Sequence, residues 1–141
     1  MKSGDLYRFV AVVGVMLIVL PAMPQKTKLR SLVIPLQCAG GDCPLLNGVP
    51  GTAGMRSGFV RLLAGETVGW HTTGENEESL VILQGKGEAM IDGEASQQFS
   101  APAVVYIPPA TRHNVKNAGE VPLQYVYVVA PAEKSVPDSA Q

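Results

Sequence analysis

Two histidines are the residues of this chain best suited to chemistry, and the sequence contains no others. His71 stands in the stretch GWHTTGENEESLVILQG, ahead of Glu75, Glu77 and Glu78, and His113 follows a Pro-Pro pair. Imidazole nitrogens and carboxylate oxygens are ligands for divalent transition metals, and imidazole also exchanges protons near neutral pH. A single histidine is more often a packing or surface side chain, so the function depends on what surrounds each one.

Both histidines lie in a region whose pattern predicts short β-strands separated by turn residues at a spacing of roughly 8–12 positions. The predicted strands are Phe59–Leu63, Thr67–His71, Leu80–Leu83, Glu88–Ile91, Val104–Ile107, Arg112–Val115 and Leu123–Val129. Pro108-Pro109 should end one strand, because neither proline can donate to a ladder. Asp92-Gly93 predicts a type I′ hairpin. No segment has a sustained helical period, so we expect an all-β sandwich or barrel.

The first histidine lies in a pattern that resembles the first motif of the cupin superfamily, G-x5-H-x-H-x3-4-E-x6-G. Gly65, His71, Glu78 and Gly85 match this motif at the right spacing, and Thr73 stands at the position of its second histidine. The resemblance spans roughly residues 59–129. It implies a small single-domain cupin with a double-stranded β-helix, or jelly-roll, barrel.

The second histidine lies in a pattern that resembles the end of the second cupin motif, P-x-G-x2-H-x3-N. Pro108, His113 and Asn117 match it, Ala110 replaces the glycine, and Pro102 stands where the motif opens with another glycine. Each motif alone is moderately specific. The two in order, joined by a strand-turn-strand segment of the right length, strongly favour this fold.

The resemblance implies a metal site formed by His71, Glu78 and His113. Thr73 removes one of the usual ligands, and we expect its hydroxyl to bind a metal-bound water instead. Strand parity favours Glu78 over Glu77, which we assign to the solvated loop. Two histidines and one carboxylate leave coordination positions open, as in non-haem iron oxygenases, and also suit catalytic zinc. The expected cofactor is a divalent ion of Fe, Mn, Zn, Ni or Cu.

Two further side chains are candidates for a substrate cavity. Gln84 has the same strand parity as Glu78, and Tyr106 lies in a predicted strand, as do Tyr125 and Tyr127. For the tyrosines the alternative is a core or interface position. Two side chains beside the histidines, Trp70 and Arg112, are assigned to the outer surface, with an anionic substrate as the alternative partner of Arg112.

The first 24 residues predict a secretory signal. Lys2 and Arg8 flank the start of the apolar run Phe9–Leu20, which is shorter than the ~20 residues of a membrane span. The cleavage site is poor, so an uncleaved membrane anchor is the alternative. Export, to a periplasm or to the outside, makes a Cys38–Cys43 disulfide the expected state of the two cysteines.

The remaining sequence divides into three parts. Residues 25–56 are rich in glycine and proline and predict a linker or arm with one strand at Leu32–Ile34. Residues 57–131 form the predicted barrel, and 132–141 a flexible tail.

Composition narrows the function classes. The 141 residues are 46% hydrophobic and carry a formal net charge of -1, which fits one globular domain and gives no electrostatic footprint for nucleic acid. The leading hypothesis is a metal-dependent enzyme acting on a small organic molecule, an oxygenase before an isomerase or lyase. The alternatives are a non-catalytic binding or sensing module and a structural homodimer with a metal-free site, and the resemblance implies a homodimer in any case.

Overall fold

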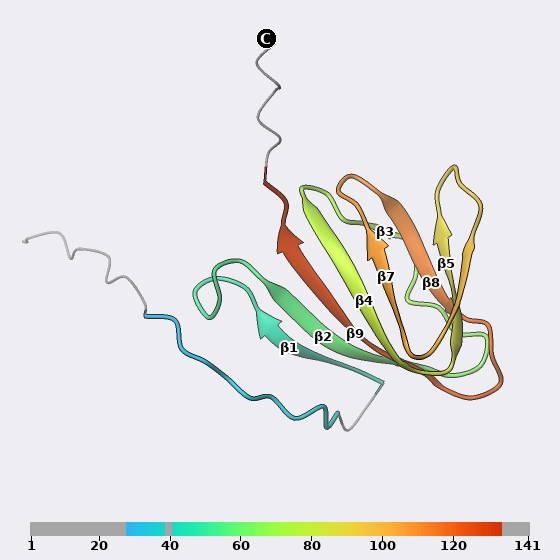
Figure 1. The fold of residues 1–141 in the computed structure, drawn as a ribbon, viewed down its shortest axis with the longest axis horizontal. Helices are drawn as coiled ribbons and strands as arrows, with labels where there is room; N and C mark the ends of the chain where they lie inside the picture. The colour runs from blue at the N-terminus through green and yellow to red at the C-terminus, as the bar shows by residue number, and fades with distance from the viewer. Residues whose placement is uncertain (1–27, 39–40, 134–141) are drawn as a thin grey trace, which may run out of the picture.

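The computed structural model describes residues 28–38 and 41–133, and these residues form nine β-strands in two facing sheets (Figure 1). The strands are β1 (Asp42–Asn47), β2 (Arg56–Leu62), β3 (His71–Thr72), β4 (Asn76–Gln84), β5 (Lys86–Ile91), β6 (Gln97–Ser100), β7 (Ala103–Ile107), β8 (Arg112–Asn117) and β9 (Leu123–Pro131). No helix long and apolar enough to cross a membrane occurs within these two ranges. The predicted signal segment, and most of the predicted tail, fall outside the described residues.

The strands pair antiparallel in the order β1-β2-β9-β4-β7 in the larger sheet and β3-β8-β5-β6 in the smaller one. Several strands that follow each other in the sequence, such as β3 and β4, lie in different sheets. Strands that are neighbours in a sheet can therefore be far apart in the sequence, as β2 and β9 are. This is the double-stranded β-helix that the sequence predicted. Strands distant in sequence therefore build each wall of the barrel (Figure 1).

The core fills the space between the sheets with alternate side chains of each strand. On β4, Leu80 and Ile82 are each 1% exposed, whereas Val81 between them is 38% exposed. On β9, Leu123 and Tyr125 are buried. This period of two is what one buried sheet face requires. The remaining core residues include Val60, Leu62, Ala89, Ile91, Val105, Ile107 and Val115.

The turn after β4 explains why the first motif ends in glycine. Gly85 has a φ of +89°, which favours glycine. A side chain there would also meet the Pro122 carbonyl oxygen at 2.8 Å and the Leu123 Cα at 2.9 Å. Both the backbone conformation and the close approach of the chain before β9 therefore exclude a larger residue.

The segment before the barrel differs from the prediction. Leu32–Ile34 is not a strand, because it pairs with no other described strand; Leu32 and Ile34 instead line a shallow groove beside β1. Part of the predicted arm is strand β1, which pairs with β2. A disulfide joins Cys38 to Cys43 in β1, with the two Cα atoms 5.8 Å apart.

Three local predictions in the barrel were wrong. The predicted strand Thr67–His71 is reduced to β3 and an isolated bridge between Thr67 and Lys116. Asp92-Gly93 does not form a type I′ turn, because only Gly93 has a positive φ and the loop from β5 to β6 is longer. Strand β6 was not predicted, since its sequence QQFS has no apolar alternation.

Candidate metal centre

The two histidines lie side by side on neighbouring strands. Strand β3 pairs with β8 in a register that places His71 opposite His113, and their ring centroids are 4.2 Å apart. Directly opposed residues of an antiparallel pair share one face of the sheet. The pairing thus brings together two side chains that are 42 positions apart in the sequence.

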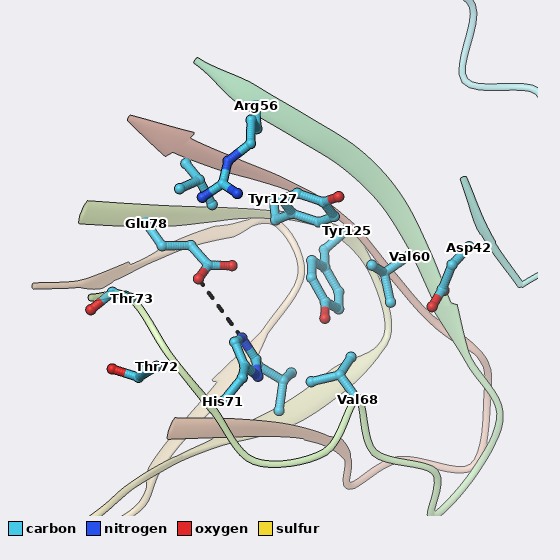
Figure 2. Close-up of a pocket in the computed structure, with 12 residues that line it drawn as sticks. Asp42, Arg56, Val60, Val68, His71, Thr72, Thr73, Glu78, Tyr125 and Tyr127 are labelled. Atoms are coloured by element: carbon cyan, nitrogen blue, oxygen red, sulfur yellow. Dashed lines mark ion pairs between the residues drawn. The ribbon is translucent and has the colours of Figure 1, made fainter. Parts of the chain in front are cut away.

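The carboxylate comes from the opposite sheet. Glu78 on β4 places its Oε2 atom 3.4 Å from Nε2 of His113. The same oxygen lies 3.9 Å from Nε2 of His71, the contact drawn as a dashed line in Figure 2. One ligand atom from each of the three residues lies within 4.8 Å of the others. The structure therefore brings together the three residues expected from the sequence, with Glu78 buried and His71 exposed at the pocket.

The main chain orients both imidazole rings. Nδ1 of His71 lies 2.9 Å from the Gly69 carbonyl oxygen, and Nδ1 of His113 lies 3.2 Å from the Thr111 carbonyl oxygen. A carbonyl oxygen only accepts, so each Nδ1 must donate, and in the neutral ring this leaves the Nε2 lone pair on the side of Glu78. Metal-bound histidines are held in this way. Sequence reasoning missed these two contacts, because main-chain partners leave no sequence signal.

The buried polar atoms fit a metal ion. His113 is 0% exposed, and its Nε2 has no hydrogen-bond partner in the structure. An unpaired buried nitrogen is costly, and an ion coordinated there would remove the cost. Ligand atoms at about 2.1 Å from one metal lie about 3–3.4 Å apart, so a shift of an ångström or so would complete the set.

Electrostatics around His113 reflect the nearby carboxylate. Burial acts to lower the pKa of His113, but contact with Glu78 and the Thr111 carbonyl raises it above its ordinary value. In the metal-free protein a proton on His113 therefore partly compensates the negative charge of Glu78, as a metal ion would.

Thr73 lines the pocket, and its hydroxyl bonds to the main chain. Its hydroxyl donates to the Pro108 carbonyl oxygen at 2.8 Å and accepts from the Thr111 N–H at 3.0 Å. These bonds join the turn after β3 to the turn before β8, the two segments that carry the histidines. The residue that replaces a ligand histidine thus braces the site through the main chain.

The second motif positions His113 by two further devices. Ala110 takes a φ of 55°, the left-handed conformation that favours glycine, which is the residue at this position in the motif that the sequence resembles. Asn117 is 1% exposed; its amide donates to the carbonyls of Leu62 and Val121 at 3.0 and 2.9 Å and accepts the Gly119 N–H at 2.8 Å. It fixes the far end of β8.

A pocket of about 400 Å³ is lined by two of the three ligand residues, His71 and Glu78 (Figure 2), and His113 is buried behind them. This volume is within the usual range for small-molecule sites. Its lining from the large sheet is Asp42, Arg56, Val60, Glu78, Tyr125, Tyr127 and Val129, and from the facing side Val68, His71, Thr72, Thr73 and Val115. His71 and Glu78 therefore border a space large enough for a small molecule.

Sequence reasoning missed Arg56 as a pocket residue, because the predicted arm included it. It is the first residue of β2, where it pairs with Val129 of β9, which in turn pairs with Glu78 of β4. The three residues thus form one row across neighbouring strands, and strands are spaced about 4.8 Å apart. Only the long-range pairing of β2 with β9 could have revealed this.

Tyr125 and Tyr127 of β9 also line the pocket, on the same sheet as Arg56 and Glu78 (Figure 2). Tyr127 fits because Gly58 lies opposite it; a Cβ at position 58 would be 2.5 Å from the ring. Burial, and then the negative charges of Glu78 and Asp42, raise the pKa of Tyr125, so its hydroxyl keeps its proton at neutral pH. The alternation Leu123-Tyr125-Tyr127-Val129 was the signal that could have placed both rings inside.

The two residues predicted for the cavity lie outside it. Tyr106 is 55% exposed, because the buried residues of β7 are its neighbours Val105 and Ile107, and its hydroxyl donates to Glu77 at 3.1 Å. Gln84 is exposed, because a register shift after Ile82 breaks the parity it would share with Glu78.

Arg112 and Trp70 lie on the outer surface, as expected. The Arg112 guanidinium lies 4.8 Å from the centre of the Trp70 ring and 3.4 Å from an Asp92 carboxylate oxygen. Both contacts are exposed and close to the β3–β8 pair. Arg112 is therefore engaged beside the site and does not line the pocket.

Comparison with known families matches the barrel and both motifs. The model of the cupin domain family matches residues 58–129, which is just over half of the chain. The chain belongs to the cupin family. No curated protein matches this cupin.

Solved cupin structures share its fold. A cupin 2 conserved barrel domain protein from Salinispora arenicola is 25% identical, with a TM-score of 0.61 over 73% of this chain and 91% of that one. An RmlC-like cupin protein from Methanocaldococcus jannaschii is 17% identical, with a TM-score of 0.58 and coverages of 72% and 91%. The Cnp3 cupin domain of Schizosaccharomyces pombe is 23% identical, with a TM-score of 0.58 and coverages of 64% and 64%. This cupin thus spans less than two thirds of that last chain.

Proposed function

We propose that this cupin binds one divalent transition metal ion through His71, Glu78 and His113 and holds a small organic molecule against it. The buried, unpaired Nε2 of His113 carries this proposal, because it faces Glu78 and an ion would satisfy both groups. Three protein ligands leave coordination positions free on the side of the pocket.

The ligand set favours oxygen-dependent oxidation as the chemistry. When bound in a two-histidine, one-carboxylate set, Fe²⁺ supplies reactivity towards O2. The chain's own residues supply the rest. Gly69 and Thr111 hold the two rings, apolar and aromatic walls limit the water around the reacting groups, and the protonated Tyr125 hydroxyl can donate a hydrogen bond in the pocket.

Titration with Co²⁺ tests this proposal, since its visible absorption reports coordination. We expect saturation at one ion per chain, and a further spectral change when azide occupies an open position. Glu78→Gln should abolish or greatly weaken binding. Glu77→Gln is the matched control, because Glu77 is the adjacent carboxylate on the other face of β4 and contacts Tyr106. Equal effects of the two variants would refute the assignment of Glu78. Oxygen consumption by the Fe²⁺ form with organic substrates separates an enzyme from a binding module.

We also propose that the protein is exported. The apolar run Phe9–Leu20 after two cations, and the Cys38–Cys43 disulfide, support this, because such disulfides persist in oxidising compartments. Cell fractionation with mass spectrometry of the N-terminal peptide tests it. A shortened chain outside the cytoplasm indicates cleavage, and an intact N-terminus in the membrane fraction indicates an anchor. A cytoplasmic chain with free thiols would contradict export.

A homodimer formed through the outer face of the large sheet is our proposal for the assembly. Four apolar or aromatic side chains on β4 and β7 support it, being 38–66% exposed on one face: Val81, Leu83, Val104 and Tyr106. Contiguous exposed apolar surface of this kind often marks an interface. Light scattering should give twice the chain mass for the wild type and one chain mass for Val104→Glu. A monomeric wild type would refute the dimer.

A further inference from the structure

We infer that the pocket takes a small organic acid, whose carboxylate Arg56 holds beside the metal ion. This inference rests on the metal site proposed above and specifies its ligand. Arg56 lies in the same cross-strand row as Glu78, two strands away, so their Cα atoms are roughly 10 Å apart. An arginine side chain and a carboxylate together can span that gap.

The position of Arg56 is set by the β1–β2 hairpin. Its Cγ lies 3.3 Å from the point that a Cβ of Gly48 would occupy, so the aliphatic stem passes over the bare Gly48 backbone. Its guanidinium extends into the pocket beside Tyr127 and towards Glu78 (Figure 2). It forms no ion pair with any residue of the described ranges. The planar fork of N–H donors is therefore available for two hydrogen bonds to a carboxylate.

The charge of the pocket depends on the metal. A divalent ion, Arg56, Glu78 and Asp42 together carry a net charge of +1, whereas the three side chains alone carry -1. An anion is therefore attracted more strongly to the loaded site than to the empty one. Because coupling between two ligands is reciprocal, the anion should also tighten metal binding.

The rest of the lining specifies an organic anion. Between Arg56 and the far end of the pocket lie the rings of Tyr125 and Tyr127 and the side chains of Val60 and Val68. These walls offer contact to an apolar body, which inorganic phosphate lacks. A molecule with a carboxylate at one end and a hydrocarbon or aromatic body at the other would satisfy both parts of the pocket.

Calorimetric titration of the Co²⁺-loaded full chain tests this inference. The probes are isobutyrate and benzoate, their neutral amides, and inorganic phosphate. We expect both acids to bind at least tenfold more tightly than the amides and than phosphate. Arg56→Gln should weaken acid binding about tenfold to a hundredfold, the range expected for charge-assisted hydrogen bonds. Arg61→Gln removes the same charge from the other face of the same strand and should leave acid binding unchanged.

Each other outcome counts against the inference. Acid affinity that survives Arg56→Gln, or amides that bind as tightly as acids, would overturn it, and so would phosphate binding as tightly as the acids. Cobalt content is measured on the same samples. Wild-type protein that takes up no metal refutes the proposed function, and this inference with it because the ion supplies the positive charge. Loaded protein that does not discriminate acids from amides refutes this inference alone.

Discussion

Replacing Thr73 with valine tests whether this residue braces the site or serves the metal. The change keeps the shape of the side chain and removes the hydroxyl. That hydroxyl donates to the Pro108 carbonyl at 2.8 Å and accepts from the Thr111 N–H at 3.0 Å. Thr73 is 6% exposed, so water would not readily replace these partners.

The expected loss of stability follows from those two bonds. Each net hydrogen bond contributes about 1 kcal/mol, so we expect the loss of both in Thr73→Val to lower the free energy of unfolding by about 2 kcal/mol. In a domain of this size 1 kcal/mol moves Tm by roughly 4–8 °C, which gives a fall of roughly 8–16 °C.

Urea unfolding and thermal melting, both with chelator present, measure this loss without a contribution from metal. Thr72→Val is the control, because the neighbouring Thr72 is exposed and only accepts a 3.3 Å bond from the Gly74 N–H. We expect the control to stay within about 0.5 kcal/mol of wild type. Equal stabilities of the two variants would refute the bracing role. The Co²⁺ spectrum of folded Thr73→Val should match wild type, and a changed spectrum would instead support a metal-bound water at Thr73.

Three further predictions concern the second motif. Ala110→Gly relieves a left-handed conformation that costs about 1–2 kcal/mol for alanine, but it also increases the entropy of the unfolded chain. Urea unfolding should therefore show a net gain in the free energy of unfolding of about 0.5–1 kcal/mol, and a loss would contradict this prediction. Asn117→Asp places a carboxylate against two main-chain carbonyls and should cost about 3–5 kcal/mol, and a variant within 1 kcal/mol of wild type would refute this. In metal-free protein the raised pKa of His113 contributes stability below its unfolded pKa that is lost as pH rises through the folded value. Urea unfolding from pH 5.5 to 8.5 should show this slope, and His113→Gln should remove it.

The sequence predicts those strands whose apolar residues alternate and whose ends carry prolines or glycines. Strand β7 ends at Ile107 directly before Pro108-Pro109, as that rule requires. Strand β6 is mostly polar and exists because it pairs with β5, so no local pattern marks it. The opposite case is Leu32–Ile34, an apolar run of strand-forming residues that pairs with no described strand.

The residues of the site are likewise predictable only where a local pattern marks them. The motif spacing identifies His71, Glu78 and His113, since each lies at a fixed offset within one of the two motifs. Arg56 reaches the same pocket only through β9, which pairs with both β2 and β4. Arg56 and its partner Val129 are 73 positions apart, and one sequence alone carries no signal for their pairing. The prediction that Gln84 faces the cavity was wrong for a local reason. A register shift after Ile82 changes the face on which Gln84 lies, and counting alternate residues cannot detect such a shift.

Metal content tests the central claim most directly. The full chain should be purified without chelator or histidine tag, beside the His71→Ala/His113→Ala double variant, and both analysed by inductively coupled plasma mass spectrometry. We predict close to one equivalent of Fe, Mn, Ni, Cu or Zn in the wild type and none in the double variant. Equal metal in both, or none in the wild type after each ion is added back, would contradict a metal centre at these residues.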